Sequence, residues 1–251
     1  MDQASIAKAA DLLAEARKTK KLLERLPEGL RPASVAEAAL VQDAVMTRLN
    51  ETPGGWKIAP YSEGGWNYGV MIKSMMWDNG TAIPSKLLTM LGLEAEIAFR
   101  FDRDLPARGT DYTAEEVASA MTCLIGMEIC DTRFTTMTVP DPLERTADFM
   151  VNAGFVSGTL RPDWRSLDLP EVEASLIING EVVVKQKGEG PKKKPLDRAV
   201  AMVNILRHTT GVKTGHVVTC GSYTGMVFAK PGDKVGASFS GLGAVELSFT
   251  A

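Results

Sequence analysis

The stretch that decides the fold is LGLEAEIAFRF, residues 91–101. Apolar and aromatic residues dominate it, as is typical of a buried β-strand. Glu94 and Glu96 interrupt the apolar run two positions apart. Because side chains in a strand alternate between its two faces, these carboxylates share a face. The sequence therefore predicts a strand at 93–101 that projects two negative charges from one side.

The residues that follow predict an α+β fold. Short β-type runs dominate the last two-thirds of the chain, with two helices between them, which favours a mixed or antiparallel sheet over a doubly wound one. One helix is expected from Thr113, where Glu116 completes a capping box, and the other after Pro195. The further strands are expected at roughly 124–131, 154–159, 174–184, 216–220, 226–229 and 234–249.

The chain divides into an N-terminal helical segment at 1–52 and a β-rich catalytic domain at 53–251, joined as one continuous unit. Residues 4–19 are rich in Ala and Leu, which are strong helix formers. Ser34 is the expected N-cap of a second helix, as the first residue of a capping box. Residues 54–69 contain five glycines and are expected to form a loop.

Composition and charge exclude several classes of function. The 251 residues, 45% hydrophobic and 24% charged, are ordinary for a globular protein. A net charge of -3 gives no electrostatic footprint for nucleic acid, so no such partner is expected. No membrane partner is expected either, since no apolar run approaches a membrane span, and no secretory signal is visible. The three cysteines lack metal-type spacing, and reduced thiols in a cytoplasmic protein are the simplest interpretation.

A third carboxylate lies in a similar setting. Glu128 stands among apolar residues in LIGMEICDTRF, residues 124–134. Three carboxylates at one point would repel by about 4 kcal/mol per pair, for a 4 Å separation and a dielectric of about 20. They would take up protons or bind a cation, and an all-oxygen set suits Mg²⁺, Mn²⁺ or Ca²⁺ rather than zinc. A solvated outer face would also explain Glu94 and Glu96, and spacing alone does not link Glu128 to them.

Several motifs resemble the fumarylacetoacetate hydrolase superfamily. They are LEAEIAFRFDRDLP, GMEICDTRF and TCGSYTGMVFAKPGDKVGASFSGLGAVELSF. The segments LLERLPEGLRPASVAEAALVQDAV and GGWKIA are similar to the branch of 2-keto-4-pentenoate hydratases and 4-oxalocrotonate decarboxylases. The resemblance covers nearly the whole chain in the same order. It implies an N-terminal helical segment followed by a fumarylacetoacetate-hydrolase-like mixed β-sheet roll with a few helices.

The resemblance implies a metal-dependent active site. In this family the two strand glutamates and the later glutamate hold a divalent metal, which implies Glu94, Glu96 and Glu128 as ligands of Mg²⁺ or Mn²⁺. The lysine of the family's G-x-K-I/M-G segment implies a catalytic Lys57. In such enzymes the metal chelates the carboxylate and 2-oxo group of the substrate and stabilises its enolate. A lysine near that oxygen could transfer protons or hold the developing charge.

The substrate contacts include both matches and departures. Glycines around Ser222 and Thr224 in GSYTG let backbone N–H groups approach an anion, and the resemblance implies both residues as carboxylate contacts. A plain turn between strands is the alternative. Asn67 stands where hydratases commonly carry Asp, and an amide cannot act as a carboxylate base. Phe149 and Val151 replace the family's Asn and Ser, which predicts a more apolar substrate or a loss of hydratase activity.

The resemblance implies a metal-dependent lyase, a hydratase acting on a 2-hydroxydienoic or 2-oxo acid, as in aromatic meta-cleavage catabolism. A 4-oxalocrotonate-type decarboxylase is the alternative. C–C hydrolysis of an acylpyruvate is the third, although such hydrolases use a His–Glu pair on a lid and no histidine precedes His208. A catalytically silent binding homologue is the fourth, and retention of three glutamates argues against it. The resemblance also implies a homo-oligomer and allows a complex with a partner enzyme of the pathway.

Overall fold

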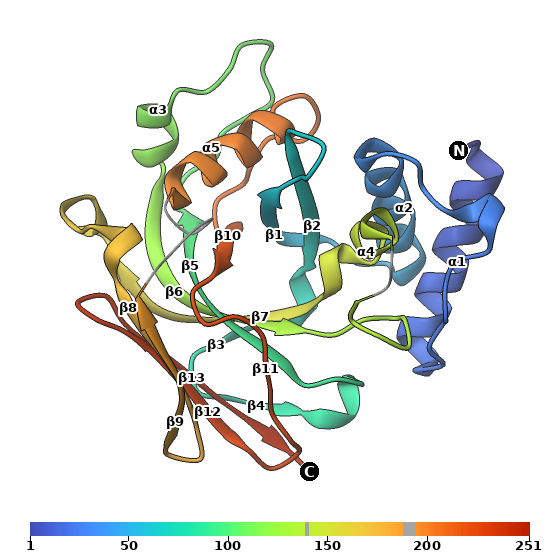
Figure 1. Ribbon diagram of the computed structural model, residues 1–251. Coiled ribbons are helices and arrows are strands. Elements are labelled where there is room, and N and C mark those ends of the chain that lie inside the picture. Colours follow the sequence, from blue (N-terminus) through green and yellow to red (C-terminus); the bar gives the residue numbers. More distant parts are fainter. Residues whose placement is uncertain (139–140, 188–193) are drawn as a thin grey trace.

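Two helices precede the sheets, as predicted for the first fifty residues. Figure 1 shows the computed structural model, which describes residues 1–138, 141–187 and 194–251. Helix α1 (Gln3–Thr19) is capped by Asp2 and helix α2 (Val35–Leu49) by Ser34. Each capping side chain accepts a hydrogen bond from a backbone N–H of the first turn. The two helices pack against each other beside the sheets.

The larger sheet surrounds the strand predicted at 93–101. Within the described residues it has eight strands in the order β2-β1-β10-β5-β6-β7-β3, with β11 paired to β5. Strand β1 runs parallel to β10 and β3 parallel to β7, while the other pairs are antiparallel. The sheet is therefore mixed, as predicted. The strands are β1 (Pro53–Pro60), β2 (Trp66–Ile72), β3 (Met76–Asp78), β5 (Gly92–Phe101), β6 (Met121–Cys130), β7 (Asn152–Arg161), β10 (Val217–Ser222) and β11 (Val227–Phe228).

A smaller sheet packs against the larger one. Its order in the described chain is β4-β13-β12-β8-β9. Strand β13 crosses close to β7, since a Cβ added at Gly158 would lie 2.4 Å from the carbonyl oxygen of Ala244. Glycine is needed there because the two backbones approach so closely. The strands are β4 (Thr81–Pro84), β8 (Glu173–Ile178), β9 (Glu181–Lys187), β12 (Lys234–Phe239) and β13 (Gly243–Thr250).

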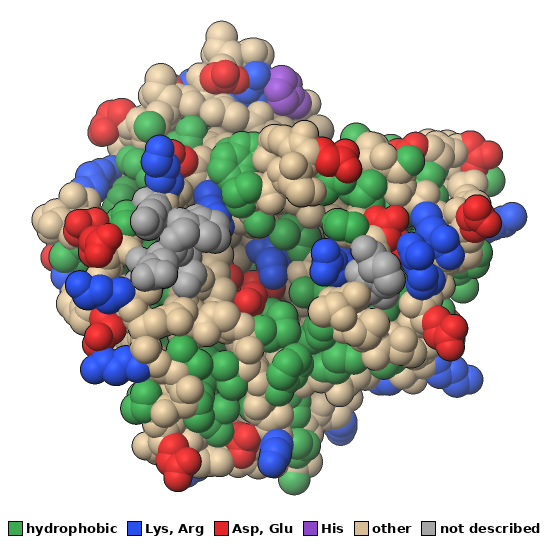
Figure 2. Space-filling view, viewed as in Figure 1, with side chains coloured by type: hydrophobic (Ala, Val, Ile, Leu, Met, Phe, Trp, Pro, Cys, Tyr) green, Lys and Arg blue, Asp and Glu red, His purple; other side chains and the backbone are tan. Residues whose placement is uncertain are grey.

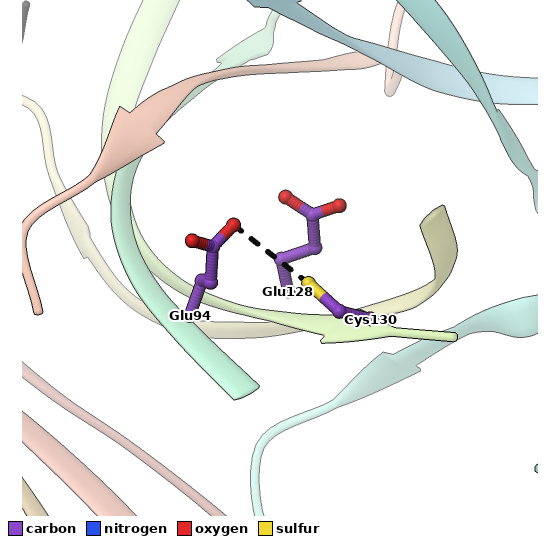
Figure 3. A group of neighbouring side chains, drawn as sticks. All are labelled: Glu94, Glu128 and Cys130. Atoms are coloured by element: carbon purple, nitrogen blue, oxygen red, sulfur yellow. Dashed lines mark hydrogen bonds between the residues drawn. The ribbon is translucent and has the colours of Figure 1, made fainter. Parts of the chain in front are cut away.

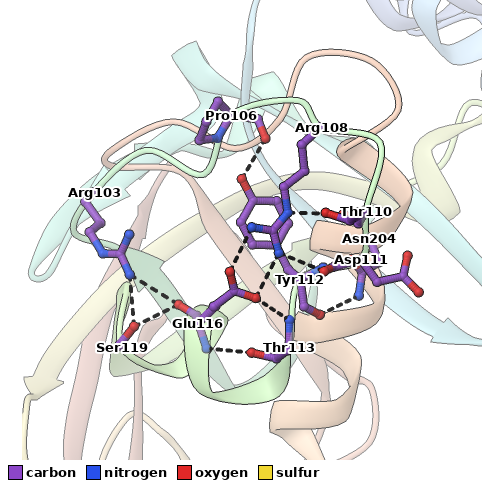
Figure 4. Close-up of polar contacts among 10 residues, drawn as sticks. All are labelled: Arg103, Pro106, Arg108, Thr110, Asp111, Tyr112, Thr113, Glu116, Ser119 and Asn204. Atoms are coloured by element: carbon purple, nitrogen blue, oxygen red, sulfur yellow. Dashed lines mark hydrogen bonds and ion pairs between the residues drawn. The ribbon is translucent and has the colours of Figure 1, made fainter.

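Three further α-helices in the described ranges cover the sheets: α3 (Ala114–Ala118), α4 (Pro142–Ala147) and α5 (Pro195–Leu206). Thr113 and Glu116 form the predicted capping box of α3, which Figure 4 shows together with Arg108 on the Glu116 carboxylate. Helix α5 begins at its proline as expected and packs over β10. The short 3₁₀ turns are η1 (Glu28–Leu30), η2 (Lys73–Met75), η3 (Ser85–Leu87), η4 (Phe149–Val151), η5 (Trp164–Ser166) and η6 (Leu169–Glu171).

Of the loop predicted at 54–69, only residues 61–65 lie outside the strands, so the prediction is wrong for the rest of the segment. This segment forms β1 and the start of β2, an antiparallel pair in the larger sheet. Gly54, Gly55 and Gly69 lie in the strands and serve close packing, whereas Gly64 and Gly65 have positive φ and lie in the turn between β1 and β2. A Cβ at Gly55 would lie 2.1 Å from the Val217 carbonyl oxygen, and one at Gly69 would lie 2.3 Å from the Phe149 carbonyl oxygen. Glycine content alone therefore misidentified two strands whose neighbours leave no room for a side chain.

Other boundaries also differ from the predictions. The helix from Thr113 ends at Ala118, because Met121 already belongs to β6. The strand predicted at 174–184 is the hairpin of β8 and β9, which turns at Asn179 and Gly180, both with positive φ. The strand predicted at 234–249 is likewise the hairpin of β12 and β13. None of the helices in the described ranges is long and apolar enough to cross a lipid bilayer.

Candidate metal centre

Glu94 and Glu128 lie directly opposite each other on two neighbouring central strands. Strands β5 and β6 pair antiparallel, with Glu94 opposite Glu128 and Glu96 opposite Gly126. Residues directly opposite share a face, so the three carboxylates project to one side of the sheet. Figure 3 shows Glu94, Glu128 and Cys130, whose possible ligand atoms all lie within 4.8 Å of one another. The structure thus brings together two carboxylates that are 34 positions apart in the sequence.

Glu96 lies next to this group but is held differently. Within the described chain the 4.8 Å group comprises Glu94, Glu128 and Cys130. Oε2 of Glu96 accepts hydrogen bonds from the Gly221 N–H at 2.9 Å and from the Thr219 hydroxyl. Burial, together with the negative charges of Glu128 and Glu94, raises the pKa of Glu96 to about 8. Three ionised carboxylates without a compensating charge are therefore unfavourable here, and a bound proton or cation would reduce their repulsion.

Lys57 compensates part of this charge. Its Nζ donates a hydrogen bond to Oε1 of Glu128 at 2.6 Å. The Lys57 side chain is 12% exposed and that of Glu128 is 0% exposed, so the ion pair is buried. Burial opposes the charged form of Lys57, but the combined attraction of Glu128 and the neighbouring negative groups outweighs burial and raises the pKa of Lys57. Asn152 donates to the same oxygen of Glu128 at 3.0 Å.

The remaining oxygen of Glu128 suits a metal ion. Oε2 of Glu128 is buried and has no hydrogen-bond partner among the described residues. A buried unpaired carboxylate oxygen is costly, and a hard cation such as Mg²⁺ is the partner that carboxylate oxygens prefer. Burial raises the pKa of the Cys130 thiol well above its usual value, and this thiol donates to Glu94 at 3.7 Å. The donor set therefore fits Mg²⁺ or Mn²⁺ through oxygen, with Cys130 supporting Glu94 as a protonated thiol.

A cavity of about 410 Å³ opens beside Glu94, Glu96 and Lys57. This volume is within the usual range for small-molecule sites, about 300–1,000 Å³. Figure 2 shows a hollow near the centre of the molecular face, where acidic and basic side chains lie among hydrophobic ones. The cavity wall includes the predicted residues Lys57, Glu94, Glu96 and Ser222, and also Met150 and Arg198, which sequence reasoning did not identify.

Comparison with known proteins places the chain in a family. The model for the C-terminal domain of fumarylacetoacetate (FAA) hydrolase matches residues 68–250. The chain belongs to the fumarylacetoacetate hydrolase family. The resemblance inferred from the sequence motifs is therefore confirmed, and so is the α+β fold class.

Relatives of this family member are hydratases. It is 28% identical over 185 residues to 2-keto-4-pentenoate hydratase of Burkholderia vietnamiensis. The alignment covers 73% of this chain and 70% of the relative. It is 25% identical over 192 residues to 2-oxo-hept-4-ene-1,7-dioate hydratase of Escherichia coli, with the same coverage of 73% and 70%. The structure of 4-oxalocrotonate decarboxylase from Pseudomonas putida, complexed with magnesium and adipate, has the same fold. The two structures superpose with a TM-score of 0.85 at 20% sequence identity. The superposition covers 99% of this chain and 98% of the decarboxylase chain.

Two of the predicted substrate contacts have structural partners in this family member. The Thr224 hydroxyl accepts a hydrogen bond from the Ala95 N–H at 3.1 Å, which ties the GSYTG loop to β5. The Asn67 carboxamide oxygen accepts a hydrogen bond from the Thr146 hydroxyl at 2.9 Å, which ties β2 to α4. Neither is in the described lining of the cavity. Their contact with a substrate stays a prediction.

The turn at 149–151, which contains Phe149 and Val151, has a rare backbone conformation. Phe149, Met150 and Val151 have φ angles of 56°, 52° and 59°. Each non-glycine residue in this left-handed region costs roughly 1–2 kcal/mol. The turn buries Phe149 beneath Arg17, whose guanidinium lies 4.9 Å from the ring centre, and places Met150 in the cavity wall. The sequence motifs did not indicate Met150, because the departures from the family pattern are its two neighbours, Phe149 and Val151.

Proposed function

We propose that this protein is a divalent-metal-dependent hydratase acting on a small 2-hydroxydienoic or 2-oxo acid. The observation that carries the proposal is the facing Glu94–Glu128 pair beside Lys57, in which one buried Glu128 oxygen has no hydrogen-bond partner among the described residues. The hydratase relatives support the reaction class. Breakdown of aromatic compounds is the proposed metabolic setting.

Glu94, Glu96 and Glu128 are the proposed ligands of Mg²⁺, with Mn²⁺ as the alternative ion. Glu96 is included because it shares the strand face of Glu94 and lines the same cavity. A decarboxylase of the same fold complexed with magnesium supports the choice of ion. Bound here, a divalent cation would act as a Lewis acid that stabilises negative charge on a substrate oxygen.

Lys57 is the proposed proton carrier. Its raised pKa keeps Nζ protonated at neutral pH, and Glu128 fixes the ammonium at the cavity wall. An ammonium in this place can hold the charge that develops on substrate oxygen. It can deliver a proton from Nζ to substrate carbon once its pKa falls, as a cation bound at Glu128 would cause. Ser222 and Thr224 are the proposed contacts of the substrate carboxylate, with Ser222 directly in the cavity.

Decarboxylation is the second candidate, and Asn67 favours it. Hydration requires a group that activates water, and an amide cannot accept a proton at neutral pH. Decarboxylation needs the same stabilisation of negative charge but no activated water. The oxygen of Asn67 is moreover engaged by the Thr146 hydroxyl. This difference makes the product, rather than the loss of substrate, the deciding observation.

A spectrophotometric screen of dienols and 2-oxo acids with Mg²⁺ tests both candidates. Loss of ultraviolet absorbance without release of CO₂ supports hydration, while release of CO₂ supports decarboxylation. Glu128→Gln should abolish either activity, and Lys213→Met, on the exposed surface, should retain it. If the purified protein takes up neither Mg²⁺ nor Mn²⁺, the enzyme proposal fails and a silent binding homologue takes its place.

Location and assembly complete the proposal. A cytoplasmic location is supported by three buried free cysteines, which fit a reducing compartment. A homo-oligomer is proposed from the family resemblance, with a complex with a partner enzyme as an extension of it. Light scattering of the purified protein measures the first, and a monomer at micromolar concentration would contradict it.

A further inference from the structure

Arg198 is a buried cation in the cavity wall. Its side chain projects from the first turn of α5, and the residue is 3% exposed. Nη1 donates a hydrogen bond to the carbonyl oxygen of Cys220 at 2.6 Å. Nη2 is buried and has no hydrogen-bond partner among the described residues. Because buried charges are normally paired, this guanidinium has capacity left for an anion.

The end of strand β10 beside the candidate metal centre leaves room for this guanidinium. Gly221 has a φ of +104°, and a Cβ there would lie 2.3 Å from Nη1 of Arg198. Any larger residue would displace the guanidinium. The N–H of the same glycine donates to Glu96 at 2.9 Å. Gly221 therefore connects Arg198 with the carboxylates, and the guanidinium lies at the edge of the proposed metal centre.

Charge balance points to a negatively charged ligand. Lys57 and one divalent cation would neutralise the three carboxylates of Glu94, Glu96 and Glu128. Arg198 would then remain as one uncompensated positive charge in the wall of the same cavity. An uncharged ligand would leave this charge buried without a partner, which is unfavourable. A ligand that carries a carboxylate would complete the balance.

We propose that Arg198 binds a carboxylate of the substrate and determines the specificity of this cavity for anionic acids. Arginine suits this role because its planar fork matches the two oxygens of a carboxylate. The identity of the ligand as a 2-oxo acid rests on the proposed function. The carboxylate can be the one beside the 2-oxo group or one at the far end of a diacid, and two matched ligands distinguish these sources.

Isothermal titration calorimetry on the 251-residue, Mg²⁺-loaded protein tests the proposal without requiring turnover. The ligands are 2-oxopentanoate and 2-oxoadipate, which share the 2-oxo acid group and the same carbon chain and differ in a second carboxylate. Arg198→Met should weaken binding of at least one ligand by about tenfold or more, as for a lost charge-assisted hydrogen bond. Arg198→Lys keeps the charge without the fork and should lose less. Arg207→Met is the matched control, because Arg207 ends the same helix and pairs with Asp111 at 2.6 Å.

The pattern of loss identifies the carboxylate. A loss for 2-oxoadipate alone places Arg198 at the far carboxylate, and a loss for both ligands places it at the carboxylate beside the 2-oxo group. Unchanged affinities in Arg198→Met, with Mg²⁺ uptake and melting temperature preserved, overturn the proposal. Failure of the wild-type protein to bind either ligand also overturns it. If Arg198→Met does not fold, Arg198→Lys decides. A protein that binds both acids through Arg198 but converts no dienol refutes only the proposed function.

Discussion

Replacing Lys57 with Met should destabilise the metal-free protein far more than the Mg²⁺-loaded protein. Lys57 Nζ lies 2.6 Å from Oε1 of Glu128, whose side chain is 0% exposed. Removing one member of a buried ion pair costs about 3–5 kcal/mol, because the other charge is left uncompensated. For a chain of this size that loss corresponds to a fall of about 6–20 °C in melting temperature.

Mg²⁺ should restore much of this loss. A divalent cation at Glu94 and Glu128 would supply the positive charge that the variant lacks, and removal of the ammonium would also remove its repulsion of the cation. Differential scanning calorimetry in EDTA and in saturating Mg²⁺ measures both states. The difference in melting temperature between wild type and Lys57→Met should at least halve when Mg²⁺ replaces EDTA.

Two further variants separate charge from packing. Combining Lys57→Met with Glu128→Gln removes both charges and should recover stability relative to Lys57→Met alone. Lys213→Met breaks the exposed pair with Asp104, whose N–O distance is 3.2 Å, and should leave the melting temperature almost unchanged because solvent screens the pair. An equal fall in EDTA and Mg²⁺, or one no larger than that of Lys213→Met, would refute the reasoning.

Two stability predictions follow from other contacts. Hydrogen bonds from Arg108 and Thr113 lower the pKa of Glu116 to about 2. A lowered pKa stabilises the fold above the unfolded value of 4.5 and loses this effect as the pH falls towards 2. Glu116→Gln should therefore lower the melting temperature at pH 7 but not at pH 2, and an equal difference at both pH values would contradict this. A Cβ at Gly126 would lie 2.0 Å from Cζ of Phe155, so Gly126→Ala should cost about 1–3 kcal/mol in chemical unfolding, with Phe155→Leu relieving it.

The local features of the sequence predicted much of the fold. The apolar run around Glu94 and Glu96 identified β5, because strand alternation is a local property. Ser34 and Thr113 marked two helix starts for the same reason, since a cap depends on neighbouring residues. The register that places Glu94 opposite Glu128 is different, because it joins strands separated by about twenty residues of irregular chain and a short helix. Only the family resemblance linked these two glutamates before the structure did.

Arg198 had a local signal that was overlooked. The buried face of α5 comprises Pro195, Arg198, Ala199, Met202, Val203 and Leu206, which follow helical spacing. An arginine in an otherwise apolar stripe indicates a buried charge, which requires a partner or a function. Its position beside Gly221 could not be foreseen, because packing of α5 over β10 joins residues more than twenty positions apart.

Gly69 gives the left-handed turn at 149–151 a testable link to the cavity. A Cβ at Gly69 would lie 2.3 Å from the Phe149 carbonyl oxygen, a backbone atom that cannot rotate away. Gly69→Ala should therefore displace the turn, cost about 1–3 kcal/mol of stability and weaken 2-oxo acid binding by moving Met150, while Mg²⁺ affinity is retained. Gly29→Ala is the control, since a Cβ there would meet nothing within 4 Å. If Gly69→Ala matches this control in melting temperature and ligand affinity, the turn does not shape the cavity. The departures at Phe149 and Val151 would then have no route to substrate choice through Met150.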